Sequence, residues 1–489
     1  MSNRIRIILI GFFVLVAAGC AHYPVNPELN TVNPNEGYRY DLVRQEHNPE
    51  KPFIILAFSG GGTRAAAFSF GLLQELNLIS YTIDGQARPL LDDVEIISSV
   101  SGGSFTAAYY ALFRDRFFED FPGKMLYRNI EKDLILSLFN PYNWGRLAAP
   151  DFSRIDLAAE YYHKKIFQEQ TFGDLLNRPR GSVPFLLLNA TDISIAHRFE
   201  FTQDQFDLLC SDLNRVSIAR GVAASSDFPV AFTPLTLNNY GIKNCGKLPD
   251  WIKKGLSDKQ DNDRRKIDAK AAVSYREKHR SYCHLLDGGL SDNLGLRGPY
   301  NAITTTDAAW SLVTQENLGH IKQLMVIAVN AKTSKKHKWD ETSKPPGIKD
   351  VLGVVTGGPM DDVSLDSVEM MREHFESMKQ LSRTVNSCNK LLEDCPDSKP
   401  IPNPISNSFS FTELAFDYVK KPCIRRYLQL LPTSFNLDQT AIEALTIAAA
   451  QLLNQSEEFI SGMKELDPGW TPRTVVFPQD LENKICNRQ

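Results

Sequence analysis

The chain has 489 residues, of which 43% are hydrophobic and 23% charged, and its formal net charge is -4. This composition is typical of a globular protein with one large core or two smaller ones, and it excludes a wholly disordered chain. A nearly balanced charge provides no general basic surface for nucleic acid, so we expect any ligand to be recognised at a local site.

The first twenty residues have the order of a bacterial export signal. A basic start precedes an apolar run over residues 7–18, which is shorter than the roughly 20 residues of a membrane-spanning helix. The end of this run resembles a lipobox, in which Cys20 receives a diacylglyceryl group, although Ala17 stands where leucine is usual. We expect a signal peptide over residues 1–20 and a lipid anchor in the bacterial outer membrane, facing the periplasm. Plain secretion and a permanent membrane helix are the alternatives.

Residues 21–50 are polar and contain four prolines and several asparagines. This composition favours extended backbone over packed structure. We expect a tether between the anchor and the globular body.

Seven cysteines remain after Cys20. An exported protein can pair them, and an odd number leaves at least one thiol unpaired within the monomer. Cys388 and Cys395 are near enough in sequence to close a small loop, and two separate thiols are the alternative.

Four continuous apolar runs predict strands that are buried on both faces of a sheet. They cover residues 53–58, 94–100, 183–188 and 324–329. Each of the first two ends in a glycine-containing turn before a stretch with helical periodicity, over residues 63–76 and 105–113. This alternation predicts an α/β fold with a mostly parallel central sheet between layers of helices.

The remaining segments predict helices. Residues 117–176 contain no clear strand and are expected to form a helical insertion over the sheet. After about residue 343 the best helical patterns cover residues 364–392 and 438–453. We therefore expect one catalytic domain over residues 51–335 and a mainly helical region over residues 336–489.

A serine follows the second predicted strand in the sequence Ser99-Val-Ser-Gly-Gly103. The motif approximates G-x-S-x-G, in which a serine at a sharp strand-to-helix turn exposes its hydroxyl and small neighbours leave it unshielded. An ordinary helix cap is the alternative for an isolated match. The position between a buried strand and an apolar helix favours Ser101 as a nucleophile.

The first predicted strand ends in Ser59-Gly-Gly-Gly-Thr-Arg64. Its glycines allow main-chain N–H groups to approach a ligand, and the positive end of the following helix dipole favours an oxyanion. The sequence does not fit a dinucleotide site, because Ala65 occupies the last glycine position, and it lacks the Lys-Ser/Thr pair of a phosphate-binding loop.

Leu285-Leu-Asp-Gly-Gly289 places Asp287 at the end of an apolar run. Asp-Gly alone indicates only a turn. A carboxylate within about 3 Å of Ser101 can instead act as a general base without a histidine.

Together these motifs resemble the patatin-like phospholipase family over residues 52–331. The order of the glycine loop, the serine motif and Asp287-Gly-Gly carries the resemblance. Two further matches support it, Asn189-Ala-Thr-Asp192 and the small-residue stretch Val222–Pro234.

The resemblance implies a lipid acyl hydrolase with a patatin-like three-layer α/β/α fold. Ser101 would be the nucleophile and Asp287 its base. The loop of Gly60, Gly61 and Gly62 would supply the oxyanion hole, with the amides of Gly61 and Gly62 as donors and Arg64 orienting the loop. The substrate would be a membrane phospholipid or lysophospholipid, and no metal or other cofactor is implied. Ser99 and Ala65 replace family glycines, so the turn geometry is expected to differ.

Two other functions fit the same sequence. An ordinary α/β-hydrolase esterase would add a histidine to the serine and aspartate, and His320, His337 and His374 are the candidates. Alternatively, the chain would bind lipid or an outer-membrane partner without turnover, because a fold does not by itself establish catalysis.

Overall fold

The computed structural model describes residues 21–227, 232–259, 263–306, 310–316, 321–334, 338–343, 345–393, 399–401 and 408–487. The predicted signal peptide, including Cys20, lies outside these ranges. Within them, no helix is both long enough and apolar enough to cross a bilayer.

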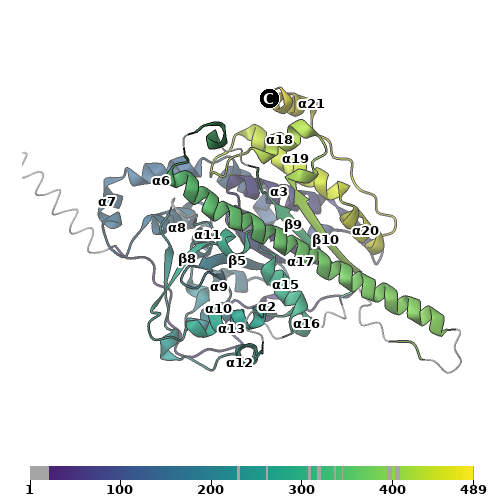
Figure 1. Cartoon of the computed structure of the whole chain (residues 1–489), viewed down its shortest axis with the longest axis horizontal. Helices are drawn as coiled ribbons and strands as arrows, with labels where there is room; N and C mark the ends of the chain where they lie inside the picture. The colour runs from purple at the N-terminus through teal and green to yellow at the C-terminus, as the bar shows by residue number, and fades with distance from the viewer. Residues whose placement is uncertain are drawn as a thin grey trace, which may run out of the picture.

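A mixed, mostly parallel sheet forms the centre of the molecule (Figure 1). From one edge to the other its strands are β10 (Ser408–Ala415), β9 (Gln323–Asn330), β1 (Phe53–Phe58), β4 (Val94–Val100), β5 (Phe185–Asp192), β8 (Tyr282–Asp287) and β7 (Leu235–Asn238), and β6 (His197–Glu200) pairs with β5. The strands from β10 to β5 run parallel to one another, whereas β8, β7 and β6 pair in antiparallel fashion. The expected sheet is confirmed.

Helices cover both faces of this sheet, which explains why β1, β5 and β9 are buried along their whole length. In Figure 1, α17 crosses in front of the sheet. One helical layer contains α3 (Thr63–Leu78), α4 (Gly102–Phe113), α11 (Ile218–Ser225) and α19 (Gln439–Gln455), which contact one another in the pairs α3–α4, α4–α11 and α3–α19, and the other includes α14 (Gly289–Asp292), α15 (Arg297–Thr304) and α17 (Ile348–Leu392). The three-layer α/β/α arrangement is therefore as expected.

The segment between β4 and β5 is helical, as predicted. It contains α5 (Phe117–Phe121), α6 (Ile130–Leu138), α7 (Pro141–Leu147), α8 (Arg154–Lys165) and α9 (Phe172–Leu176). Smaller peripheral elements are α2 (Tyr40–Val43), β2 (Ser80–Ile83), β3 (Gln86–Pro89), α10 (Gln203–Leu208), α12 (Asp250–Leu256), α13 (Arg264–Ser274), α16 (Leu312–Gln315), α18 (Pro422–Gln429), α20 (Glu457–Leu466) and α21 (Gln479–Cys486).

The C-terminal region is mainly helical but does not form a separate layer. Its strand β10 pairs with β9 from Ser408 opposite Gln323 to Ala415 opposite Asn330. Its helix α19 packs along α3. The expected boundary near residue 335 therefore does not divide two cores, because both regions complete one sheet and one helical layer.

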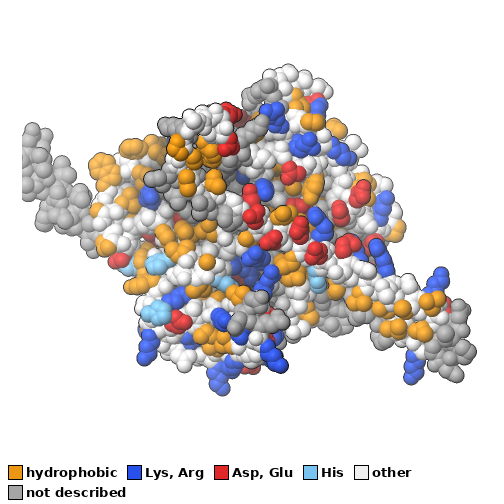
Figure 2. All heavy atoms as spheres, viewed as in Figure 1, with side chains coloured by type: hydrophobic (Ala, Val, Ile, Leu, Met, Phe, Trp, Pro, Cys, Tyr) orange, Lys and Arg blue, Asp and Glu red, His pale blue; other side chains and the backbone are white. Residues whose placement is uncertain are grey.

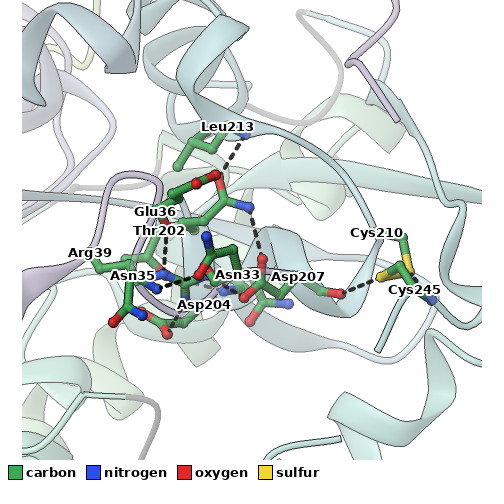
Figure 3. Close-up of polar contacts among 12 residues, drawn as sticks. Asn33, Asn35, Glu36, Arg39, Thr202, Asp204, Asp207, Cys210, Leu213 and Cys245 are labelled. Carbon is green, nitrogen blue, oxygen red and sulfur yellow. Dashed lines mark hydrogen bonds and ion pairs between the residues drawn. A yellow bond between two sulfur atoms is a disulfide. The ribbon is translucent and has the colours of Figure 1, made fainter. Parts of the chain in front are cut away.

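The N-terminal segment differs from the expected tether over residues 21–50. Tyr38 and Tyr40 are fully buried in the main core, and Arg39 donates hydrogen bonds to Asp204 (2.6 Å) and Asp207 (2.5 Å) (Figure 3). The segment contains bends, turns and the short helix α2 (Tyr40–Val43), and three consecutive side chains with specific partners fix it to the body.

The described residues contain two disulfides, Cys210–Cys245, which appears in Figure 3, and Cys423–Cys486. Cys283 and Cys388 are free thiols. Cys395, the expected candidate for a small loop with Cys388, lies outside the described residues.

Replacement of Arg39 tests the attachment of the N-terminal segment. Arg39→Met leaves two carboxylates without their buried cation, so we expect the free energy of unfolding to fall by about 3 to 5 kcal/mol. Lys253→Met removes an exposed partner of Asp250 and is the matched control, with a much smaller effect than Arg39→Met because solvent screens this pair. Thermal or urea unfolding measures both. Equal effects of the two variants would contradict the structural role of Arg39.

Candidate active site

Ser101 occupies the turn between β4 and α4. Its backbone has φ 51° and ψ -120°, a conformation that non-glycine residues rarely adopt. The main-chain N–H of Ser101 donates to the carbonyl oxygen (3.1 Å) and to Oγ (2.9 Å) of Ser225, the last residue of α11. These bonds hold the serine in its strained turn, as expected for a nucleophile that must project from the sheet.

The two glycines after Ser101 are required by close packing between the first two strand-to-helix turns. A Cβ atom on Gly102 would lie 2.0 Å from the carbonyl oxygen of Gly62, and one on Gly103 would lie 2.7 Å from Cβ of Phe58. Larger residues at these positions would separate the serine turn from the glycine loop.

Asp287 ends β8 and reaches the same place from the other side of β5. Its main-chain N–H donates to the carbonyl oxygen of Asp227 (3.0 Å), and its Oδ1 accepts the N–H of Gly289 (2.8 Å). The Ser101 side chain interacts with the Asp287 carboxyl group and favours its ionised form, and both side chains line the same cavity.

Burial raises the pKa of Asp287 to about 6, and the hydrogen bonds from Gly289 and Ser101 oppose this shift. The carboxylate is therefore more basic than an exposed aspartate and is still ionised at neutral pH. This combination suits a general base, whose pKa is best placed near the working pH.

Ser101 and Asp287 line one cavity of about 430 Å³, together with Gly60, Gly61 and Arg64. Strand ends supply one wall of this cavity. The other walls come from the segment after β9, from Thr433 and from the first third of α17, which adds Val354, Gly357, Gly358, Met360 and Asp361. The cavity is thus built from both the catalytic core and the C-terminal region.

Gly60, Gly61 and Gly62 differ in the hydrogen bonds of their main-chain N–H groups and in their access to the cavity. The N–H of Gly60 donates to the carbonyl oxygen of Asn293 (3.0 Å). Gly61 lines the cavity with φ 141°, and we find no acceptor for its N–H among the described residues. Gly62 packs against Gly102 and is not part of the cavity lining. Gly61 is consequently the loop residue whose main-chain N–H is best placed for a ligand oxygen.

Arg64 connects the glycine loop to two later parts of the chain. Its Nε donates to the carbonyl oxygen of Ala331 (2.8 Å), and its other nitrogens donate to that of Leu431 (2.9 Å) and to Oγ1 of Thr433 (3.2 Å). Burial among these neutral acceptors lowers the pKa of Arg64 to about 10. Arg64 therefore ties the glycine loop to the segments after β9 and after α18.

Two residues beside the site did not stand out in the sequence. Asn293 lines the cavity, and its carbonyl oxygen holds Gly60. Asp227 is fully buried, its Oδ2 accepts the N–H of Leu235 (3.1 Å), and its Oδ1 has no partner. Asp227 belongs to the small-residue stretch that was recognised, but its burial depends on neighbours that no local pattern identifies.

The histidine candidates do not join this cavity within the described ranges. His374 lies on α17, where its ring packs against Tyr300 and Phe375 and faces a different cavity. His320 and His337 lie outside the described residues, as does part of the stretch Val222–Pro234. No histidine of the described ranges lines the cavity of Ser101.

The glycine-rich loop, Ser101 and Asp287 therefore meet at one cavity beside a mostly parallel sheet. The family model of the patatin-like phospholipases matches residues 56–300, half of the chain. The chain belongs to this family. No curated protein sequence matches the chain significantly.

Similar solved structures include human GIVD cytosolic phospholipase A2. One of them has 13% sequence identity and a TM-score of 0.37, and covers 65% of this chain and 50% of the human chain. Another, in complex with a methyl gamma-linolenyl fluorophosphonate inhibitor and terbium chloride, has 13% identity, a TM-score of 0.41 and coverages of 87% and 61%. VipD from Legionella pneumophila has 12% identity, a TM-score of 0.28 and coverages of 91% and 82%. The chain thus spans about half to three fifths of the human enzyme's length.

Replacement of Asp227 tests the electrostatics behind the site. Burial raises the pKa of Asp227 to about 9, with a smaller contribution from Asp287. Because the pKa of Asp227 is higher in the folded state than in the unfolded state, the contribution of this carboxyl group to stability is complete below the unfolded-state pKa of 3.8. This contribution is lost as the pH rises through the folded-state pKa of about 9. Asp227→Asn keeps the acceptor for Leu235 and removes this loss. We expect the free energy of unfolding of Asp227→Asn, relative to that of the wild type, to increase by about 2 to 4 kcal/mol between pH 5 and pH 8.

Denaturant unfolding at several pH values measures this trend. Asp250→Asn, which replaces an exposed aspartate, is the control and should not share the trend. A gain for Asp227→Asn that does not change with pH would contradict the assignment of a neutral, buried carboxyl group.

Proposed function

We propose that the chain hydrolyses acyl esters of membrane glycerophospholipids or lysophospholipids with a Ser101–Asp287 dyad. The observation that carries this proposal is that the Ser101 side chain and the Asp287 carboxyl group line one cavity and interact there. A hydroxyl in contact with a basic carboxylate is the arrangement that activates a serine without a histidine.

In the first half of the reaction, Ser101 Oγ attacks the acyl carbon while its proton moves to the Asp287 carboxylate. The carbonyl oxygen becomes an oxyanion, which the main-chain N–H of Gly61 stabilises; one such donor is typically worth about 3 to 4 kcal/mol in the transition state. The proton on Asp287 then moves to the leaving alcohol oxygen as the ester bond breaks. An acyl-Ser101 ester remains.

In the second half, a water molecule attacks the acyl carbon and transfers a proton to Asp287. The Ser101–acyl bond breaks, and Oγ recovers the proton from Asp287. The products are a fatty acid and the regenerated serine, so no metal or redox partner takes part.

We also infer that the mature protein is anchored at Cys20 in the bacterial outer membrane and faces the periplasm. The order of the first twenty residues supports export and lipidation. The two disulfides add support, because disulfides persist in oxidising compartments.

Substitution of the dyad tests the catalytic proposal. For hydrolysis of a soluble short-chain ester, we expect Ser101→Ala and Asp287→Asn each to lower kcat by about 10³-fold or more, because each removes a step in proton transfer or acyl transfer. A fluorophosphonate should label the wild type at Ser101, as read by peptide mass spectrometry, and should not label Ser101→Ala.

His374→Ala is the matched control and should retain activity within about twofold, since His374 lies at another cavity. A loss of about 10³-fold at His320→Ala or His337→Ala would favour a Ser-Asp-His triad instead. Lipid binding with no turnover in the wild type would favour the non-catalytic function.

The pH dependence of kcat/KM tests the role of Asp287. Only the ionised carboxylate accepts the Ser101 proton, so kcat/KM should rise with pH through an apparent pKa of about 6 and then level off. Stopped assays between pH 4.5 and pH 8.5 measure this curve. A midpoint near 4, the value of an exposed aspartate, would contradict a buried base.

A further inference from the structure

An exposed apolar surface covers the hairpin of α6 and α7, which belongs to the helical insertion. Five large hydrophobic side chains share this surface, here called the hairpin patch: Ile135, Leu136, Phe139, Tyr142 and Trp144. Phe139 and Tyr142 are 69% and 63% exposed. Figure 2 shows hydrophobic side chains gathered at the edge of the molecule where Figure 1 places α6 and α7. Contiguous exposed apolar surface of this kind marks an interaction site.

The patch interrupts an otherwise charged surface. No Asp, Glu, Lys or Arg occurs between residues 134 and 145, whereas Lys132, Asp133 and Arg146 stand at its two ends. An apolar surface rimmed by charged groups, with both Tyr and Trp, has the composition of a surface that sits at a membrane–water interface.

Hydrogen bonds show that the hairpin is a folded unit with this surface built into it. Asn140 caps α7 by accepting the N–H of Tyr142 (3.1 Å). The Asn143 side chain donates to the carbonyl oxygen of Ser137 (2.8 Å), and Trp144 Nε1 donates to that of Leu138 (2.7 Å). The indole N–H of Trp144 therefore has a hydrogen-bond partner within the protein, whereas the apolar part of the ring is exposed to solvent.

The positions of Ala21 and Tyr23 indicate that a lipid bilayer covers the hairpin patch. Ala21 packs with Leu138 and Leu147 of the hairpin against a small buried cluster that includes Phe152. The next turn of the chain is fixed there as well, since the N–H of Tyr23 donates to the carbonyl oxygen of Asp151 (2.7 Å). The residue before Ala21 is Cys20, the predicted attachment point of the acyl chains, so a lipid anchor would leave the protein beside the hairpin.

We propose that the hairpin patch docks on the lipid bilayer, with Phe139, Tyr142 and Trp144 inserted at the membrane–water interface beside the anchored N-terminus. This surface goes beyond the proposed function, because it concerns how the enzyme is held against a membrane and not how the ester is cleaved. The anchor fixes the distance to the membrane, and the patch fixes which side of the body faces it.

The experiment measures binding of the mature chain, residues 20–489, to vesicles of phosphatidylethanolamine and phosphatidylglycerol. Cys20→Ser excludes acyl chains, and Ser101→Ala prevents hydrolysis during the assay. Phe139→Ser/Tyr142→Ser should lower the vesicle partition coefficient at least tenfold. The control Leu430→Ser/Val476→Ser changes two side chains of similar exposure, 50% and 68%, elsewhere on the surface, and should change it less than twofold.

Trp144 provides a second measurement. Its emission should shift to shorter wavelength when vesicles are added, and this shift should be absent in Trp144→Phe, which still binds. Unchanged melting temperatures would show that the variants fold. With Ser101 intact, the patch variant should hydrolyse a soluble ester at the wild-type rate, so that docking and catalysis are tested separately.

Equal partitioning of the patch variant and its parent, or no binding by the parent, would overturn the proposal. A concentration-dependent dimer that Phe139→Ser/Tyr142→Ser abolishes would also overturn it, because the patch would then be an interface between two copies of the chain.

Discussion

The contact between two glycine turns at the carboxyl ends of β1 and β4 is the constraint on which the rest of the site depends. A Cβ atom on Gly102 would lie 2.0 Å from the carbonyl oxygen of Gly62, and one on Gly62 would lie 2.5 Å from the carbonyl oxygen of Ser434, so neither position tolerates a side chain. This contact sets the Ser101 turn against the loop that presents the Gly61 N–H. The position of Asp287 beside Ser101 then depends on the pairing of β8 with β5 in its observed register, with Asp287 opposite Ala190. Parallel strands bring such turns to one edge of the sheet.

Distant parts of the chain hold this arrangement in place. Arg64 links the glycine loop to the segments after β9 and after α18, so the C-terminal region supports the loop directly. At the other end, Arg39 binds the N-terminal segment to α10. The hairpin of α6 and α7 and the first described residue, Ala21, pack together on the body that carries the cavity. The proposed anchor, the proposed docking surface and the candidate active site therefore belong to one folded unit.

The sequence predicted the parts of the fold that depend on local pattern. The strands over residues 53–58 and 94–100 were predicted at their observed bounds, because buried parallel strands are continuous apolar runs that end in glycine turns. Ser101 and Asp287 were identified by the residues around them. Strand β10 was missed, since its alternating sequence follows the 45-residue helix α17 and its partner β9 precedes that helix. Arg39, Asp227 and Asn293 depend on partners far away in sequence, which periodicity cannot reveal.

The most direct measurement of the central claim is a crystal structure of the wild-type enzyme after reaction with a fluorophosphonate. The phosphorus atom stands in for the acyl carbon under attack, and its phosphoryl oxygen stands in for the oxyanion. The account predicts a covalent bond from Ser101 Oγ to phosphorus, a hydrogen bond of about 2.7 to 3.1 Å from the Gly61 N–H to the phosphoryl oxygen, and the Asp287 carboxyl group beside Oγ. An adduct on another residue, or a histidine imidazole between Ser101 and Asp287, would contradict it.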